Sequence, residues 1–118
     1  MKRIITLVAA LAVAATMFAV VAYGSSTRAT ATTVKVGANE FKFTLSRKSA
    51  PHGKVTFKIK NNGHIKHDFK IAGKKSKMLS PGKSTILTVT LKKGKKYTYI
   101  CTVPGHAAAG MKGTFKAT

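Results

Sequence analysis

Three side chains with metal-binding donor atoms lie close together near the end of the chain. Cys101 is the only cysteine among the 118 residues, His106 follows five residues later, and Met111 a further five residues on. A thiolate, an imidazole and a thioether suit a copper ion that alternates between Cu(I) and Cu(II), because sulfur favours the reduced ion and nitrogen the oxidised one. Zinc has no use for a thioether. Such a copper site needs a second imidazole, and His67 is the best-placed candidate.

The first 24 residues have the pattern of a targeting segment. Lys2 and Arg3 precede an uncharged apolar run over residues 4–23, and small or polar residues follow. This pattern predicts either a cleaved signal peptide or, because the run has about 20 residues, an apolar helix retained as a membrane anchor. Residues 25–33 predict a flexible Ser/Thr/Ala linker. The expected location is therefore periplasmic, cell-surface or secreted, with the anchor, if retained, at the outer face of the cytoplasmic membrane.

Export makes the single cysteine informative. One cysteine cannot form an internal disulfide, so the thiol of Cys101 is either free or bound to a metal. The alternative to a metal ligand is a small buried hydrophobic residue. The histidine and methionine at fixed spacing favour the metal ligand.

The chain is strongly basic, with 22 Lys and Arg against 2 Asp and Glu and a net charge of +20. Such a charge predicts acidic partners or surfaces and salt-dependent association. Nucleic acid is not the expected partner, because the lysines alternate with apolar residues, as over residues 54–60, in the pattern of a solvated sheet face. Specific acidic docking and simple solubility both fit this charge.

Residues 34–118 predict one all-β domain. Segments with period-2 alternation are expected to form strands, and Gly-, Pro- and Asn-rich turns separate them. About seven short strands at this spacing predict a two-sheet antiparallel Greek-key β-sandwich. The expected strands cover residues 34–37, 40–45, 54–60, 68–71, 84–91, 95–101 and 112–116.

The same alternation assigns the core. Tyr97, Tyr99 and Cys101 share one face of a strand, so the sulfur is expected to enter the core together with the tyrosines. A thiolate kept from water favours metal binding over uncontrolled oxidation. Met78 is expected to fill the core, whereas His52 and His64 are expected to be turn residues. The other residues predicted to point inward are Val34, Val36, Phe41, Phe43, Leu45, Val55, Phe57, Ile59, Phe69, Ile71, Leu87, Val89 and Leu91.

Over residues 34–118 the chain resembles the cupredoxins, the small blue copper proteins, and most closely their azurin, auracyanin and plastocyanin branch. The resemblance depends on four motifs that occur in order. They are Asn61-Asn62-Gly63 before His67-Asp68-Phe69, Leu79-Ser80-Pro81-Gly82 before a strand, Gly94 to Tyr99 leading into Cys101, and the loop from Cys101 to Met111 followed by Lys112-Gly113-Thr114-Phe115.

The resemblance implies one copper ion in a type 1 site, with His67, Cys101 and His106 as the strong equatorial ligands and Met111 as the long axial ligand. It implies a monomeric one-electron carrier that passes electrons between redox proteins outside the cytoplasm. The alternative function is holding or delivering copper. An enzyme is not expected, because related copper oxidases need His-x-His pairs or a second cysteine, and the sequence has neither.

Two departures from the family pattern are notable. Four residues separate His106 from Met111, as in auracyanin-like loops, whereas azurins have three. Asp68 stands where many members have Asn, and we expect it to accept hydrogen bonds from Thr102 and so connect the two ligand loops. The alternative is a plain surface acid.

The residues around His106 are unusually apolar for so basic a chain. Small apolar side chains would let a partner approach the imidazole edge, so these residues are predicted to form an electron-transfer patch, with nearby lysines attracting an acidic redox partner. The alternative is that the alanines only fill a short loop. The predicted patch consists of Val103, Pro104, Ala107, Ala108 and Ala109.

Overall fold

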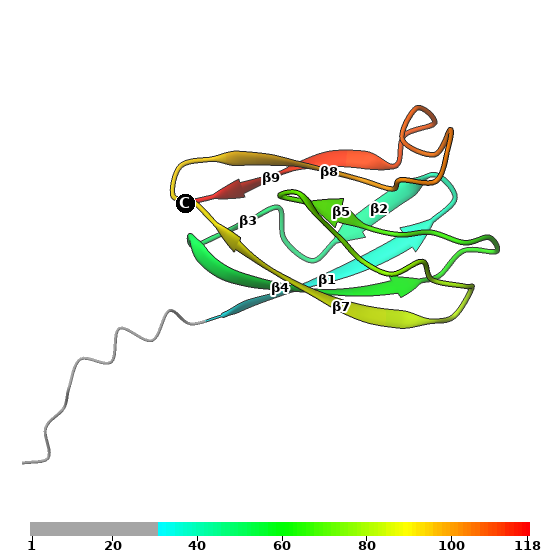
Figure 1. Ribbon diagram of the computed structural model, residues 1–118, viewed down its shortest axis with the longest axis horizontal. Coiled ribbons are helices and arrows are strands. Elements are labelled where there is room, and N and C mark those ends of the chain that lie inside the picture. Colours follow the sequence, from blue (N-terminus) through cyan, green and yellow to red (C-terminus); the bar gives the residue numbers. More distant parts are fainter. Residues whose placement is uncertain (1–30) are drawn as a thin grey trace, which may run out of the picture.

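Nine strands lie within residues 31–118, the part of the chain that the computed structural model describes, and the longer ones show the expected alternation of apolar and polar side chains (Figure 1). The predicted export segment, residues 1–24, and most of the predicted linker lie outside the described residues. The strands are β1 (Thr32–Asn39), β2 (Lys42–Leu45), β3 (Ser49–Ala50), β4 (Gly53–Asn61), β5 (Lys70–Ile71), β6 (Lys74–Lys75), β7 (Ser84–Leu91), β8 (Lys96–Ile100) and β9 (Lys112–Ala117).

The strands form two sheets that pack face to face. One sheet has the order β2-β1-β4-β7 and the other has the order β3-β9-β8-β5-β6. β1 runs parallel to β4, and β3 runs parallel to β9, while the other pairs are antiparallel. The chain passes through β2 and β3 before it returns in β4, and a parallel neighbour requires such a crossover rather than a tight hairpin.

The all-β sandwich predicted from the sequence is confirmed, with three differences in detail. The sheets are mixed rather than purely antiparallel. The sequence did not predict this, because turn signals indicate hairpins and do not show which distant strands become neighbours. Two strands of two residues each, β3 and β6, are too short to produce an alternating pattern. β1 begins at Thr32, so the sheet includes the last residues of the stretch interpreted as a linker.

Inward-facing aromatic and β-branched side chains from both sheets form the main core, in which Phe57, Phe69 and Phe115 are fully buried. Two core predictions are wrong. Phe41 is 40% exposed because it lies in the turn between β1 and β2, where the strand alternation does not apply. Met78 is 46% exposed because it precedes the buried Leu79 in an extended segment and faces the opposite side.

Two long connections meet at one end of the sandwich, on the right in Figure 1. One joins β4 to β5 and carries His67, and the other joins β8 to β9 and carries residues 101–111. They approach within hydrogen-bonding distance of each other. Residues 31–118 contain no helix long and apolar enough to cross a membrane.

Candidate metal centre

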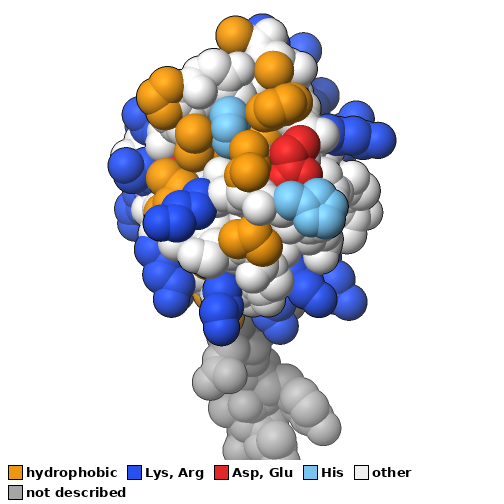
Figure 2. All heavy atoms as spheres, turned by 90° about the vertical axis from the view of Figure 1, so that its right-hand side faces the viewer, with side chains coloured by type: hydrophobic (Ala, Val, Ile, Leu, Met, Phe, Trp, Pro, Cys, Tyr) orange, Lys and Arg blue, Asp and Glu red, His pale blue; other side chains and the backbone are white. Residues whose placement is uncertain are grey.

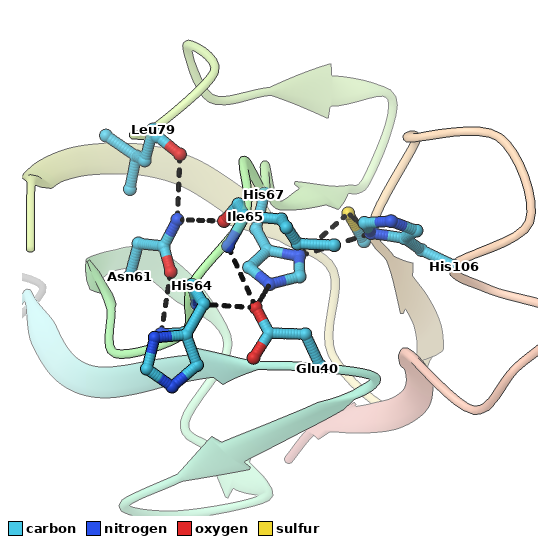
Figure 3. A network of polar contacts seen from close by, with 9 residues as sticks. Glu40, Asn61, His64, Ile65, His67, Leu79 and His106 are labelled. Carbon is cyan, nitrogen blue, oxygen red and sulfur yellow. Dashed lines mark hydrogen bonds and ion pairs between the residues drawn. The ribbon is translucent and has the colours of Figure 1, made fainter. Parts of the chain in front are cut away.

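His67 is held in place by a short backbone pairing. Its N–H donates to the carbonyl of Leu79 at 3.1 Å, and the Leu79 N–H donates back at 2.8 Å. Asn61, fully buried at the end of β4, donates from its side-chain amide to the carbonyls of Ile65 and Leu79 and accepts the N–H of Gly63 (Figure 3). The loop before His67 is therefore tied on both sides to the rigid end of β4.

Cys101 directly follows β8, and the loop after it folds back on itself. The His106 N–H donates to the carbonyl of Val103, and the Met111 N–H donates to the carbonyl of His106, both at 3.0 Å. The Cys101 N–H donates to the carbonyl of Met111 at 3.1 Å. These bonds close the loop and bring its first, middle and last members together on one side.

Three donor atoms converge between the two loops. The Nδ1 atoms of His67 and His106 lie 3.2 Å apart, and the Cys101 Sγ lies 3.9 Å from the first and 3.5 Å from the second. All three side chains are buried, with exposed fractions of 0% for His67, 1% for Cys101 and 7% for His106. Among the described residues this is the one group of three or more His, Cys, Asp or Glu side chains with metal-binding geometry.

The spacing fits a single metal ion. A triangle with these three sides has a centre about 2 Å from each donor atom, which matches metal–nitrogen and metal–sulfur bonds of roughly 2.0–2.3 Å in proteins. Two imidazoles and one cysteine sulfur in a trigonal arrangement are the donor set of blue copper sites. Burial raises the pKa of the Cys101 thiol, so a bound cation is what would hold this sulfur as a thiolate.

Met111 lies beside this triangle. It is fully buried and belongs to a small apolar cluster with Ala38 and Cys101, against which Phe43 and Val103 pack. This cluster adjoins the main core, because Phe43 also packs against that core. Its apolar side chains keep water away from the sulfur, which is the environment that tunes copper–thiolate sites.

The predicted contact between Asp68 and Thr102 is present. Asp68 is 1% exposed. Its Oδ1 accepts the Thr102 N–H at 2.6 Å, and its Oδ2 accepts the Thr102 hydroxyl. Because Asp68 follows His67 and Thr102 follows Cys101, these two bonds link the two loops that carry the converging donor atoms, and the alternative of a plain surface acid is wrong.

Sequence reasoning missed Glu40, the second of the two acids. Its Oε1 accepts the N–H of His64 at 2.7 Å, the N–H of Ile65 at 3.1 Å and the Nε2–H of His67 at 3.1 Å (Figure 3). The His64 bond is the main cause that lowers the pKa of Glu40 to about 2, helped by Ile65 and His67 and opposed by desolvation. The only signal in the sequence that Glu40 has a role was the rarity of acidic residues in so basic a chain.

The end of the molecule above the donors is apolar. Pro104, Ala108 and Ala109 are exposed, while Val103 and Ala107 are half-buried. Phe41 adds to this surface, since its ring packs edge-on against the His106 ring with centroids 5.1 Å apart. Figure 2 shows hydrophobic side chains gathered around a histidine on this face, with Lys and Arg side chains towards the rim.

The two remaining histidines are exposed, as expected for turn residues. The Nδ1 of His52 lies at hydrogen-bonding distance, 2.9 Å, from the carbonyl oxygen of Thr118. His64 contributes its backbone N–H to Glu40. Neither histidine belongs to the group of converging donors.

Comparison with solved structures finds auracyanins. Auracyanin from the photosynthetic bacterium Roseiflexus castenholzii, in its dithionite-reduced form, is 25% identical with a TM-score of 0.65, and the match covers 75% of this chain and 98% of that one. Auracyanin B is 25% identical with a TM-score of 0.62, covering 75% and 89%. Auracyanin A, a "blue" copper protein from Chloroflexus aurantiacus, is 21% identical with a TM-score of 0.60, covering 73% and 98%.

A comparison with curated proteins finds no match. Residues 19–118 match the family described as copper binding proteins, plastocyanin/azurin family. That match, the cupredoxin fold and the His-Cys-His donor triangle agree on one copper ion as the cofactor. The chain therefore belongs to the plastocyanin/azurin family of copper-binding proteins, the cupredoxins.

Proposed function

We propose that this protein is a one-electron carrier with a type 1 copper site. His67, Cys101 and His106 would be the strong ligands of the copper ion, and Met111 would be the weak one. The observation that carries the proposal is the buried triangle of two Nδ1 atoms and one Sγ at the end of a β-sandwich. When bound, copper supplies the redox couple. The protein supplies a rigid donor set, so little rearrangement accompanies a change of oxidation state.

The rigidity of the site supports electron transfer over copper delivery. His67 is fixed by its pairing with Leu79, Cys101 by the end of β8, and His106 and Met111 by the hydrogen bonds that close their loop. A protein that hands over its metal needs donors that a partner can reach, whereas these four side chains are buried. Copper holding or delivery remains the second candidate function.

The apolar patch formed by Val103, Pro104, Ala107, Ala108 and Ala109 is the proposed electron-transfer surface. It lies over His106, the most exposed of the three donors in the triangle. The basic rim favours redox partners with acidic docking surfaces, and complementary charges raise the rate of encounter. This function requires only a monomer and no catalytic residue, so we do not assign an enzymatic activity.

The working location is outside the cytoplasm. This part of the proposal depends on the pattern of residues 1–24, which is that of a signal peptide or an N-terminal anchor. Residues 34–118 then form the cupredoxin domain on the outer side. Fractionation of cells that express the full chain tests this, since recovery in the cytoplasmic fraction would contradict it.

The proposal is tested by adding Cu(II) to the purified metal-free protein and recording its visible spectrum. We expect an intense thiolate-to-copper absorption that Cys101→Ser abolishes. A colourless complex would contradict the blue-copper assignment. Rapid mixing with a small oxidant and a small reductant then separates the two functions. A carrier is oxidised and reduced repeatedly with its copper retained, whereas a delivery protein loses Cu(I) to a competing chelator on the same timescale.

A further inference from the structure

Hydrogen-bond donors surround the carboxylate of Glu40. One oxygen, Oε1, accepts three hydrogen bonds, from the backbone N–H groups of His64 and Ile65 and from the Nε2 of His67. A Cβ at Gly63 would lie 2.3 Å from that oxygen, so any other residue there would push the Glu40 carboxylate out of this position. The loop before β5 therefore has both the donors and the space for the Glu40 carboxylate, whose side chain is 27% exposed.

The position of this charge is unusual within this chain. Only two acids stand against 22 Lys and Arg, and within residues 31–118 neither acid forms an ion pair with a lysine or arginine. Asp68 connects the loops behind the ligands, and Glu40 contacts the ring of His67 itself. A lone carboxylate used in this way points to a role at the metal centre rather than in general solubility.

The two nitrogens of the His67 ring face different groups. Nε2 faces Glu40 at 3.1 Å, and Nδ1 faces the triangle, 3.2 Å from the His106 Nδ1 (Figure 3). A carboxylate is an acceptor only, so it fixes the proton on Nε2 and leaves the Nδ1 lone pair directed into the triangle, free to bind an ion there. A carboxylate behind a metal-binding histidine also raises its basicity as a ligand.

We propose that Glu40 is a positioning residue for the copper site, which holds His67 in the Nε2–H tautomer and favours Cu(II) over Cu(I) through its negative charge. The inference rests on the proposed copper site. This role differs from a purely structural one. If Glu40 only held the loop, any side chain that accepts the N–H groups of His64 and Ile65 could replace it.

Glu40→Gln separates the two roles, because the amide oxygen can still accept all three hydrogen bonds but the charge is lost. We expect the affinity ratio of Cu(II) to Cu(I) to fall about tenfold, which is a rise of ~59 mV in reduction potential. The matched control is Thr90→Lys, which changes the net charge by the same amount at the far end of β7, opposite Lys54. An unchanged potential in Glu40→Gln, or an equal rise in Thr90→Lys, would overturn the role of the charge.

The tautomer is tested without copper. The ¹⁵N chemical shifts of His67 in the metal-free full chain, at a pH where imidazole is neutral, should show the proton on Nε2, and a proton on Nδ1 would overturn the positioning role. The two failures are distinguishable. A wild-type protein that gives no blue complex contradicts the proposed function, whereas a blue wild type with an unshifted Glu40→Gln potential contradicts only the inference on Glu40.

Discussion

Asp68 and Thr102 join the two halves of the metal centre, since the residue after His67 accepts both the N–H and the hydroxyl of the residue after Cys101. Asp68 is buried and Thr102 is half-buried, so water competes little for these bonds. Hydrogen bonds around ligating residues fix their orientation and tune the metal. The distance between the His67 loop and the Cys101 loop is therefore set by this carboxylate as well as by the sheets.

Replacing Asp68 should loosen the site. In Asp68→Ala the Thr102 N–H and hydroxyl lose their acceptor, and leaving such groups unsatisfied costs about 1–3 kcal/mol. We expect a lower free energy of unfolding for the metal-free protein, measured with urea, together with weaker copper binding and a shifted reduction potential. Asp68→Asn keeps an acceptor for the Thr102 N–H and should lose less. Unaltered copper affinity and potential in Asp68→Ala would refute this role.

Asn61 should stabilise the loop that carries His67, although it is not itself a ligand. It makes three hydrogen bonds while fully buried, two as a donor to the carbonyls of Ile65 and Leu79 and one as an acceptor from Gly63. Asn61→Ala leaves these groups without partners, and we expect a loss of stability of at least about 1–3 kcal/mol. Thermal unfolding measures it. Asn62→Ala, at the exposed neighbouring position, is the control and should change stability far less.

The apolar patch predicts a rate effect without a binding effect. Ala108 is exposed beside His106 in the same loop, so Ala108→Asp should repel an acidic redox partner and slow electron transfer about tenfold at low salt. Copper affinity should stay as in the wild type. Thr90→Asp places the same charge at the other end of the sandwich and serves as the control. Equal rates for both variants and the wild type would show that electrons leave elsewhere.

Glu40 predicts how the stability of the metal-free protein depends on pH. Its pKa falls from an ordinary value of 4.5 to about 2 in the folded protein. The folded state therefore binds fewer protons than the unfolded state in this interval. The contribution of Glu40 to stability is complete above pH 4.5 and is lost as the pH falls towards 2. Urea unfolding across this range should show the decline, and Glu40→Gln should flatten it. A parallel decline in both proteins would assign it to other groups.

Much of the fold follows from local pattern. The long strands β4 and β7 agree with prediction to within one residue at each end, because alternation over seven or more residues leaves no other buried face. The parallel pairing of β1 with β4 did not follow, since neighbours in a sheet depend on the path of the whole chain. Phe41 was misplaced because the sequence does not mark where β1 turns into β2.

The sequence by itself predicted the donor set, because Cys101, His106 and Met111 lie on one loop and their types and spacing suit copper. It also predicted His67 and the Asp68–Thr102 contact through residues that adjoin the ligands. Only the tertiary structure decided that Glu40 lies behind His67, that Phe41 packs on His106 and that Asn61 anchors the loop. These contacts join segments between 18 and 65 residues apart or depend on a turn. No local periodicity encodes them, because they arise only when two sheets bring separate loops to one end.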